Sequence, residues 1–198
     1  MVTKTDIELY FNGTVTLDDT FADNIINQNT AYVSQIIGKP LGSNNVIEEV
    51  NVYENTDRVQ LIHVPIISVN SVYINNNDEF TPSWQEVTDY FVEDKDLGIL
   101  KLKEVITAGL RKLKVDYDYG IYPVPEEVNK LILDLCVMDV LKMIANSKIG
   151  NSDADTIDLG AIRLQGNYTG IFNNLAQLRA EINELTERLY KHKSGFRL

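Results

Sequence analysis

The sequence contains very little cysteine and histidine, the side chains that often build metal and catalytic sites. Its single cysteine, Cys136, lies in the apolar stretch LILDLCVMDVL, and its two histidines are His63 and His192. One thiol cannot form an internal disulfide, so we expect an inert, buried cysteine in a protein of a reducing compartment. Because HExxH and CxxC spacings are missing, the sequence offers no basis for a zinc site or a histidine-based catalytic triad.

Nucleotide-binding and calcium-binding motifs are also missing. The glycines follow neither the GxGxxG nor the GxxxxGK[ST] spacing that cradles phosphates. An acidic stretch offers oxygen ligands for calcium, namely Asn151, Asp153, Asp155 and Asp158. An EF-hand loop would require glycine at Thr156 and glutamate at Ile162, so we interpret this stretch as a solvated linker. Since no acid, base or nucleophile converges with another, we predict a protein that is not an enzyme and has no metal or cofactor.

Positive charge is scarce. The chain has 18 lysine and arginine residues against 29 aspartate and glutamate residues, and its net charge is −11. A protein that grips nucleic acid by neutralising phosphates needs a basic stripe, so we expect no specific DNA binding. An acidic wall is nevertheless compatible with a conduit through which DNA slides, because attraction would slow the passage of DNA.

Long hydrophobic runs are absent as well. The longest apolar stretch, residues 131–145, is interrupted by Asp134, Asp139 and Lys142 and is too short to span a membrane. The first residues, MVTKTDIELYFNG, lack the apolar segment of a secretory signal. These features favour a soluble protein that is made in the cytoplasm and does not bind membranes.

Three segments show helical periodicity. The first begins after a cap at Thr16 or Asp18 and ends at Gly38, while the second covers residues 126–147 and is apolar on nearly all sides. The third begins near Phe172. Its apolar residues step alternately by three and four along an a/d seam, namely Leu175, Leu178, Ile182, Leu185 and Leu189.

The third helical segment combines this seam with a basic end. Lys191, Lys193 and Arg197 gather after the last seam residue. A seam of so few turns does not sustain a free coiled coil. We therefore predict that the seam residues dock on a partner, and that the basic end meets an acidic partner surface or an adjacent copy of this chain.

Between the first two helices, alternating apolar residues predict antiparallel strands. One hairpin is expected from residues 46–52 and 59–63, and another from residues 90–92 and 100–102 around a turn at residues 94–98. The stretch KLKVDYDYG alternates strictly between apolar and polar residues. This alternation predicts a strand with one buried face and one solvated face.

Together these elements predict an α+β fold. Three main helices are expected to form a core with an antiparallel β-sheet inserted between the first and second, plus a C-terminal amphipathic helix. Ile66 and Val69 are expected in the sheet core, and Leu135 is expected to anchor the second helix. We predict a core domain over residues 1–150, followed over residues 151–198 by an acidic linker, a short strand and the C-terminal assembly helix.

Three phrases follow one another within residues 46–145. The first ends a strand and contains Leu61, Pro65, Ile66, Ser68 and Val69. The second spans a hairpin and contains Tyr90, Val92, Gly98 and Leu100. The third leads into the central helix and contains Val115, Tyr117, Gly120, Val124 and Pro125. This order resembles that of the head-to-tail connector (adaptor) proteins of tailed bacteriophages, in outline over residues 17–193.

The resemblance implies a structural virion protein. Such a subunit would form a homo-oligomeric ring, usually a dodecamer, that docks on the portal protein and joins it to a head-closure or tail protein around the DNA channel. It would be assembled in the host cytoplasm and reside in the neck of the virion, with DNA passing nearby without specific binding. The alternative is a non-catalytic β-sandwich-like binding module with helical flanks. That alternative requires an exposed aromatic cluster, and Trp84 is the only tryptophan.

Overall fold

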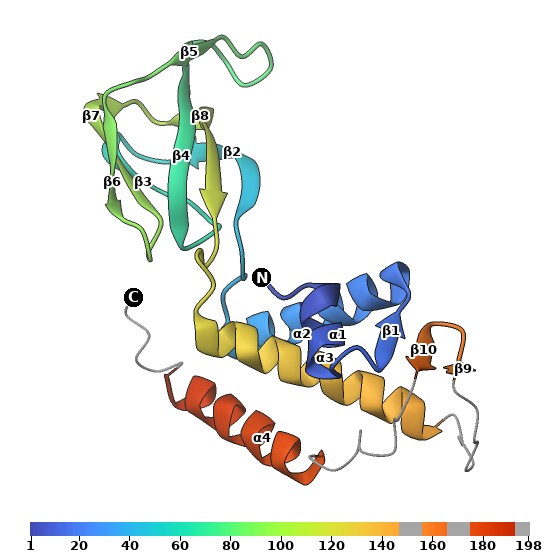
Figure 1. Cartoon of the computed structure of the whole chain (residues 1–198). Helices are drawn as coiled ribbons and strands as arrows, with labels where there is room; N and C mark the ends of the chain where they lie inside the picture. The colour runs from blue at the N-terminus through green and yellow to red at the C-terminus, as the bar shows by residue number, and fades with distance from the viewer. Residues whose placement is uncertain (147–155, 166–174, 193–198) are drawn as a thin grey trace. The chain divides into compact units, whose positions relative to one another are not determined.

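A computed structural model describes residues 1–146, 156–165 and 175–192. The chain divides into two compact units (Figure 1). The helical unit comprises the described parts of Met1–Gly38 and Val124–Phe196, and the β unit covers Lys39–Pro123. The domain boundary predicted near residue 150 falls outside the described residues and stays a prediction. β9, β10 and α4, which follow that boundary, belong to the helical unit.

The helical unit is built around one central helix. Its helices are α1 (Lys4–Tyr10), α2 (Asp19–Ile37), α3 (Glu126–Asn146) and α4 (Leu175–His192). A small antiparallel sheet accompanies them in the order β1-β10-β9, with β1 at Val15–Leu17, β9 at Thr156–Asp158 and β10 at Ile162–Gln165. Helices α1, α2 and α4 all contact α3. A helix that is apolar on nearly all sides, as predicted for α3, is therefore covered on several of them.

Local signals fix the ends of the first two helices. Asp18 caps α2 by accepting a hydrogen bond from the Phe21 N–H at 3.2 Å, and Gly38 ends it in the left-handed conformation, as the sequence predicts. Helix α1 was not predicted because seven residues are too few to show a period. It begins with a capping box in which Thr3 and Asp6 exchange hydrogen bonds.

Helix α3 supplies most of the buried residues that follow the β unit. They are Val128, Leu131, Ile132, Cys136, Val137, Met138, Val140, Leu141 and Ile144. The prediction that Cys136 is a buried thiol is confirmed, and burial raises the pKa of that thiol to about 11. Leu135, expected to anchor the helix, is only half-buried, since Leu131 and Ile132 occupy the covered face.

The β unit contains two antiparallel sheets. One has the strand order β2-β8-β4-β5 and the other the order β3-β7-β6. The strands are β2 (Asn44–Val52), β3 (Thr56–Gln60), β4 (Ile66–Asn75), β5 (Trp84–Glu86), β6 (Tyr90–Asp94), β7 (Ile99–Ile106) and β8 (Gly109–Tyr119). Both sheets contribute to one apolar core, with Leu100 of β7 and Val115 of β8 fully buried. Ile66 is buried in this core and Val69 packs against it, as predicted.

The predicted fold, a core of three main helices with one inserted sheet and a C-terminal helix, is wrong. The described residues form a β-rich α+β structure with helices α1–α4 and three antiparallel sheets. Two of these sheets lie between α2 and α3 in the sequence. Two sheets form in place of one because strands with one apolar face must bury that face against a second layer. The third sheet pairs Val15–Leu17 with residues 162–164, a contact too distant in sequence for a local pattern to reveal.

The hairpin predicted from residues 46–52 and 59–63 is also wrong. Strand β2 pairs with β8, whereas β3 pairs with β7, so the chain passes from one sheet to the other between them. The second predicted hairpin is confirmed, since β6 and β7 pair in antiparallel register. In its turn, the Asp94 carboxylate accepts hydrogen bonds from the N–H groups of Asp96 and Leu97, both at 2.9 Å.

Two glycines of the β unit occupy positions that a larger residue would not fit. Gly98 has φ +73°, and a Cβ there would lie 2.6 Å from Val64 Cγ1 and 2.8 Å from the Leu61 carbonyl oxygen. Gly120 has φ +120°, and a Cβ there would overlap the Gly42 carbonyl oxygen. Both positions therefore require glycine for the backbone conformation and for the close approach of a neighbouring segment.

Candidate interaction surfaces

The seam of α4 is partly covered within the helical unit. Leu178 and Leu189 are 3% and 7% exposed, whereas Leu175, Ile182 and Leu185 are half-buried. α4 contacts both α2 and α3, and Lys130 of α3 forms an ion pair with Glu181 of α4 at 3.0 Å. Among the described residues, the other helices thus cover part of the seam and leave the rest partly exposed.

The basic end that follows the seam is described only at its beginning. Lys191 is exposed and lies 3.8 Å from Glu187 one turn earlier. A second pair on α4, Arg188 with Glu184 at 2.6 Å, has the same i, i+4 spacing. Lys193 and Arg197, the other basic residues assigned to this surface, lie outside the described residues.

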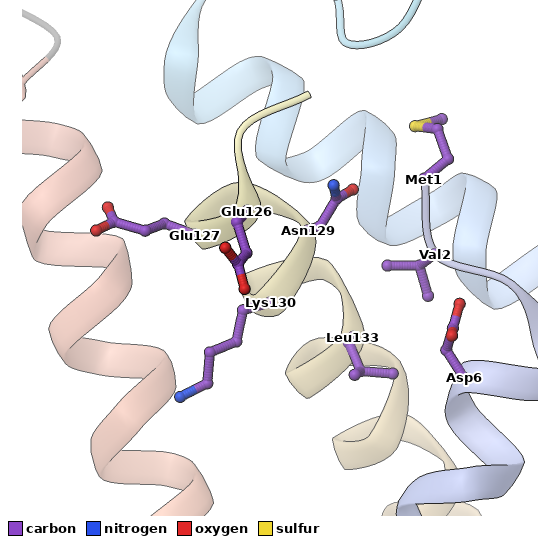
Figure 2. Close-up of a pocket in the computed structure, with 8 residues that line it drawn as sticks. All are labelled: Met1, Val2, Asp6, Glu126, Glu127, Asn129, Lys130 and Leu133. Carbon is purple, nitrogen blue, oxygen red and sulfur yellow. The ribbon is translucent and has the colours of Figure 1, made fainter. Parts of the chain in front are cut away.

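A pocket of about 500 Å³ lies between the start of α1 and the first turns of α3 (Figure 2). Its lining combines apolar and acidic side chains with one amide and one lysine: Met1, Val2, Asp6, Glu126, Glu127, Asn129, Lys130 and Leu133. Glu126 and Glu127 form the first turn of α3, where the positive end of the helix dipole stabilises carboxylates. The sequence placed these acids at a helix start, but not beside a pocket, because the position of α1 was unknown.

Asp134 is a buried acid on the same helix. Its side chain is 3% exposed, and its Oδ2 has no hydrogen-bond partner among the described residues. Burial raises the pKa of Asp134 to about 6; Lys130 opposes this shift and Glu181 adds to it. The helical pattern marked Asp134 only as an interruption of an apolar face, since its burial depends on the neighbouring helices.

The β unit brings together Glu48, Tyr117 and His63, a set that superficially resembles an acid–base centre. The buried Glu48 carboxylate accepts hydrogen bonds from the Tyr117 hydroxyl at 2.5 Å and from the Ile62 N–H at 3.1 Å. Burial and this hydrogen bond raise the pKa of Tyr117 well above its usual value. The hydroxyl therefore stays protonated and satisfies the carboxylate, which is a structural role.

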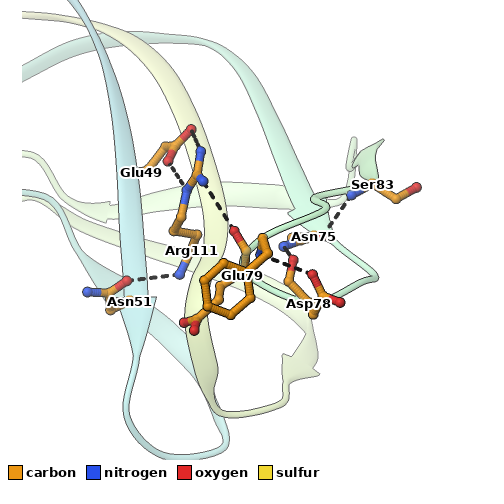
Figure 3. Close-up of polar contacts among 8 residues, drawn as sticks. Glu49, Asn51, Asn75, Asp78, Glu79, Ser83 and Arg111 are labelled. Atoms are coloured by element: carbon orange, nitrogen blue, oxygen red, sulfur yellow. Dashed lines mark hydrogen bonds and ion pairs between the residues drawn. The ribbon is translucent and has the colours of Figure 1, made fainter.

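One end of the β unit carries loops joined by polar contacts (Figure 3). The Arg111 guanidinium bonds both carboxylate oxygens of Glu49, at 2.6 and 3.1 Å, and the carbonyl of Glu79 at 3.2 Å. The backbone N–H of Arg111, a residue with φ +48°, donates to Asn51 Oδ1 at 2.9 Å. These bonds tie the loop before β5 to strands β2 and β8. Phe80 in that loop is 84% exposed.

Two aromatic side chains of the β unit that a sugar-binding or base-binding module could use, Tyr73 and Trp84, share a cationic partner. Tyr73 and Trp84 lie on neighbouring strands, β4 and β5. The ammonium of Lys114 lies 4.7 Å from the ring centre of Tyr73 and 4.8 Å from that of Trp84. This cation covers both rings and favours a structural cation–π contact.

Within the described part of the chain, no group of three or more histidine, cysteine, aspartate or glutamate residues is arranged to hold a metal. Of the calcium-like stretch, Asn151, Asp153 and Asp155 lie outside that part. Asp158 accepts a hydrogen bond from the Gly160 N–H at 2.9 Å and pairs with Arg163 at 3.2 Å. None of the helices in residues 1–146 and 175–192 has the length and apolarity of a membrane span.

No protein-family model matches the chain, and no curated protein matches it in sequence. Solved structures similar to it include chains from the neck of an empty gene transfer agent particle computed with C6 symmetry and from the neck of a native particle computed with C12 symmetry. The first has a TM-score of 0.49 and 12% identity over 88% of this chain and 79% of the matched chain. The second has a TM-score of 0.49 and 12% identity over 96% and 91%. A chain from the virion of the native particle has a TM-score of 0.41 and 12% identity over 82% and 74%. At these scores the likeness carries no conclusion about function.

Proposed function

We propose that this chain is a structural subunit of the neck of a phage-like particle. In this proposal it forms a ring that docks on the portal protein and joins it to a head-closure or tail protein around the DNA channel. The chain has no enzymatic role in this assembly. DNA passes through without specific binding, as the net charge of −11 favours.

The observation that carries the proposal is the position of the three sequence phrases shared with connector proteins. Apolar residues from all three phrases meet in the core of the β unit, where Leu61, Ile66, Leu100, Val115 and Tyr117 are all buried. The phrases come from separate stretches of the sequence but pack into the same core. Their resemblance to connector proteins therefore concerns one packed structure and not three unrelated matches.

The two glycines in these phrases strengthen the resemblance. Gly98 and Gly120 both have positive φ, and a Cβ at either position would collide with a neighbouring segment. A glycine in a motif indicates a particular backbone conformation when no other residue fits at that position. The phrases therefore encode the turns and the core of the β unit together.

A ring subunit also needs a surface for other chains. Ile182 and Leu185 of the α4 seam remain half-buried within the chain, so further contact would remove more apolar area from water. We assign portal docking or ring formation to this part of the seam, together with the basic end at Lys191, Lys193 and Arg197.

The proposal is tested by mixing the purified chain with the portal protein of the same particle. Sedimentation velocity and negative-stain microscopy should reveal a ring of this chain on the portal. An Ile182→Ser, Leu185→Ser variant should fold but lose the ring, because it replaces the apolar side chains that remain partly open. A chain that stays monomeric beside an assembled portal would contradict the proposal.

The matched control is an Ala176→Ser, Ala180→Ser variant. Both alanines are exposed on the same helix, so the change adds hydroxyl groups without altering the seam. This variant should assemble like the unmodified chain. Equal loss of assembly in both variants would point to a general weakening of α4 and not to the seam.

A further inference from the structure

We propose that the pocket at the start of α3 receives the basic end of a second copy of this chain, with Phe196 as its apolar anchor. The proposal rests on the proposed ring, since it names the surface through which one subunit would hold the next. It also links the basic segment after α4 to a feature that the ring proposal leaves unused, an open apolar pocket with an acidic rim.

The floor of the pocket is apolar and open. Val2 and Leu133 are half-buried, and Met1 is 62% exposed at its edge. A volume of about 500 Å³ has room for an aromatic side chain and part of a peptide. Covering these side chains would remove further apolar surface from water, which favours an occupant with an apolar residue.

The rim of the pocket carries negative charge that the described residues leave uncompensated. Glu126 and Glu127 are exposed, and neither forms an ion pair within the described residues. Lys130, the basic residue in the lining, is already paired with Glu181 at 3.0 Å. Acids in a first helical turn are common for their own sake, so the rim by itself would mean little. Its position around an apolar floor is what selects a basic and apolar occupant.

The basic end of the chain has the complementary composition. The sequence KHKSGFRL from Lys191 onward combines Lys191, Lys193 and Arg197 with Phe196. Basic side chains can pair with the acids of the rim while the phenylalanine occupies the apolar floor.

The geometry of a ring favours a second copy as the source of this segment. Copies of a chain with a net charge of −11 repel one another, so contact between them requires local attraction. A ring with head-to-tail contacts needs two different complementary patches on each subunit. The pocket and the basic end form such a pair.

The test uses a fluorescein-labelled peptide of residues 190–198, titrated into the full-length chain and followed by fluorescence anisotropy. We expect saturable binding that weakens as sodium chloride is raised, because exposed charges are screened. A Glu126→Gln, Glu127→Gln variant should bind about three- to tenfold more weakly, the range that two exposed ion pairs support. A Glu86→Gln, Glu104→Gln variant is the control, since it removes the same charge at exposed sites of the β unit.

A charge exchange tests for direct contact. A Glu126→Lys, Glu127→Lys variant should lose the unmodified peptide and bind a peptide with Lys193→Glu and Arg197→Glu. Circular dichroism checks that α3 remains folded in each variant. The proposal would be overturned if the lysine variant lost the unmodified peptide but did not bind the exchanged peptide. It would also be overturned if all variants bound the unmodified peptide equally.

A variant lacking residues 193–198 distinguishes a second copy from the chain's own end. At concentrations where sedimentation shows monomers, no second copy fills the pocket, so the full-length chain and this variant should bind the peptide equally. At least tenfold weaker binding by the full-length chain would show that its own end fills the pocket, and would overturn the assignment to a second copy. The peptide assay contains no portal protein, so the peptide can bind even if no ring forms on the portal. A ring can likewise form even if the peptide does not bind, so the two proposals can fail independently.

Discussion

At the scale of single residues, the Tyr117 hydroxyl is a partner on which the buried Glu48 carboxylate depends. Besides donating to Glu48, this hydroxyl accepts a hydrogen bond from the His63 N–H at 3.2 Å. Tyr117→Phe should therefore lower the free energy of unfolding by about 1 to 3 kcal/mol, the cost of leaving a buried polar group short of a partner. Chemical denaturation of the two proteins measures this difference. Tyr119→Phe is the control, since Tyr119 is half-buried and should cost less than about 0.5 kcal/mol. Equal effects would show that the Glu48 contact contributes nothing.

Asp134 makes a second prediction at this scale, for the dependence of stability on pH. Its pKa is about 6 in the folded chain, above the ordinary value of 3.8, so the folded state binds the extra proton between those values. Stability from this group is therefore present below about pH 4 and is lost as the pH rises through 6. Asp134→Asn removes this loss. Relative to the unmodified chain, the variant should gain up to about 3 kcal/mol between pH 4 and pH 8. Urea denaturation at both pH values measures the free energy of unfolding of each protein. If the difference in free energy between the variant and the unmodified chain is the same at pH 4 and pH 8, the burial of a charged Asp134 is contradicted.

At the scale of elements, tight turns depend on glycine to different degrees. Gly98 and Gly160 have similar left-handed conformations, with φ +73° and +81°. A Cβ at Gly160 would have no neighbour within 4 Å, whereas one at Gly98 would collide with Val64 and Leu61. Gly160→Ala should cost about 1 to 2 kcal/mol from backbone strain alone. Gly98→Ala should cost about 1 to 3 kcal/mol more, because the β6–β7 turn must also shift. Thermal unfolding compares the two variants, and equal melting temperatures would show that the turn yields without cost.

The helix α4 offers a test of its packing at the same scale. Leu178 is buried while Leu185 is half-buried on the same seam. Leu178→Ala should cost about 2 to 5 kcal/mol, and Leu185→Ala clearly less, because a cavity forms only where the surroundings are closed. Denaturant midpoints of the two variants measure the difference. The reverse order would mean that α4 presents another face to α2 and α3.

At the scale of the whole molecule, charge governs contact with DNA. The net charge of −11 opposes any approach to phosphates, and the basic residues of the described part are largely paired with acids. We expect duplex DNA to bind with a dissociation constant weaker than about 1 μM at physiological salt. A gel-shift titration measures this constant. Tighter binding would contradict this prediction and would indicate a local basic surface on a chain whose net charge is negative.

The sequence by itself determined the elements whose signals are local. The helical period and the caps at Asp18 and Gly38 predicted α2, and the strict alternation around Val115 predicted β8, because side-chain direction repeats with the backbone geometry of each element. The a/d seam was visible for the same reason, and the basic end was visible from the composition of the sequence. Among the helices α1–α4, α1 escaped prediction, since its seven residues are too few to show a period.

The strand partners that are distant in sequence, and the burial that depends on neighbouring helices, were decided by the tertiary structure. Nothing local to β2 and β3 shows that they join different sheets, or that Val15–Leu17 pairs with residues 162–164. The pocket beside Glu126 and the burial of Asp134 likewise depend on which helices cover α3. Periodicity specifies which face of an element is apolar, but the partner that covers this face is selected by packing of the whole chain.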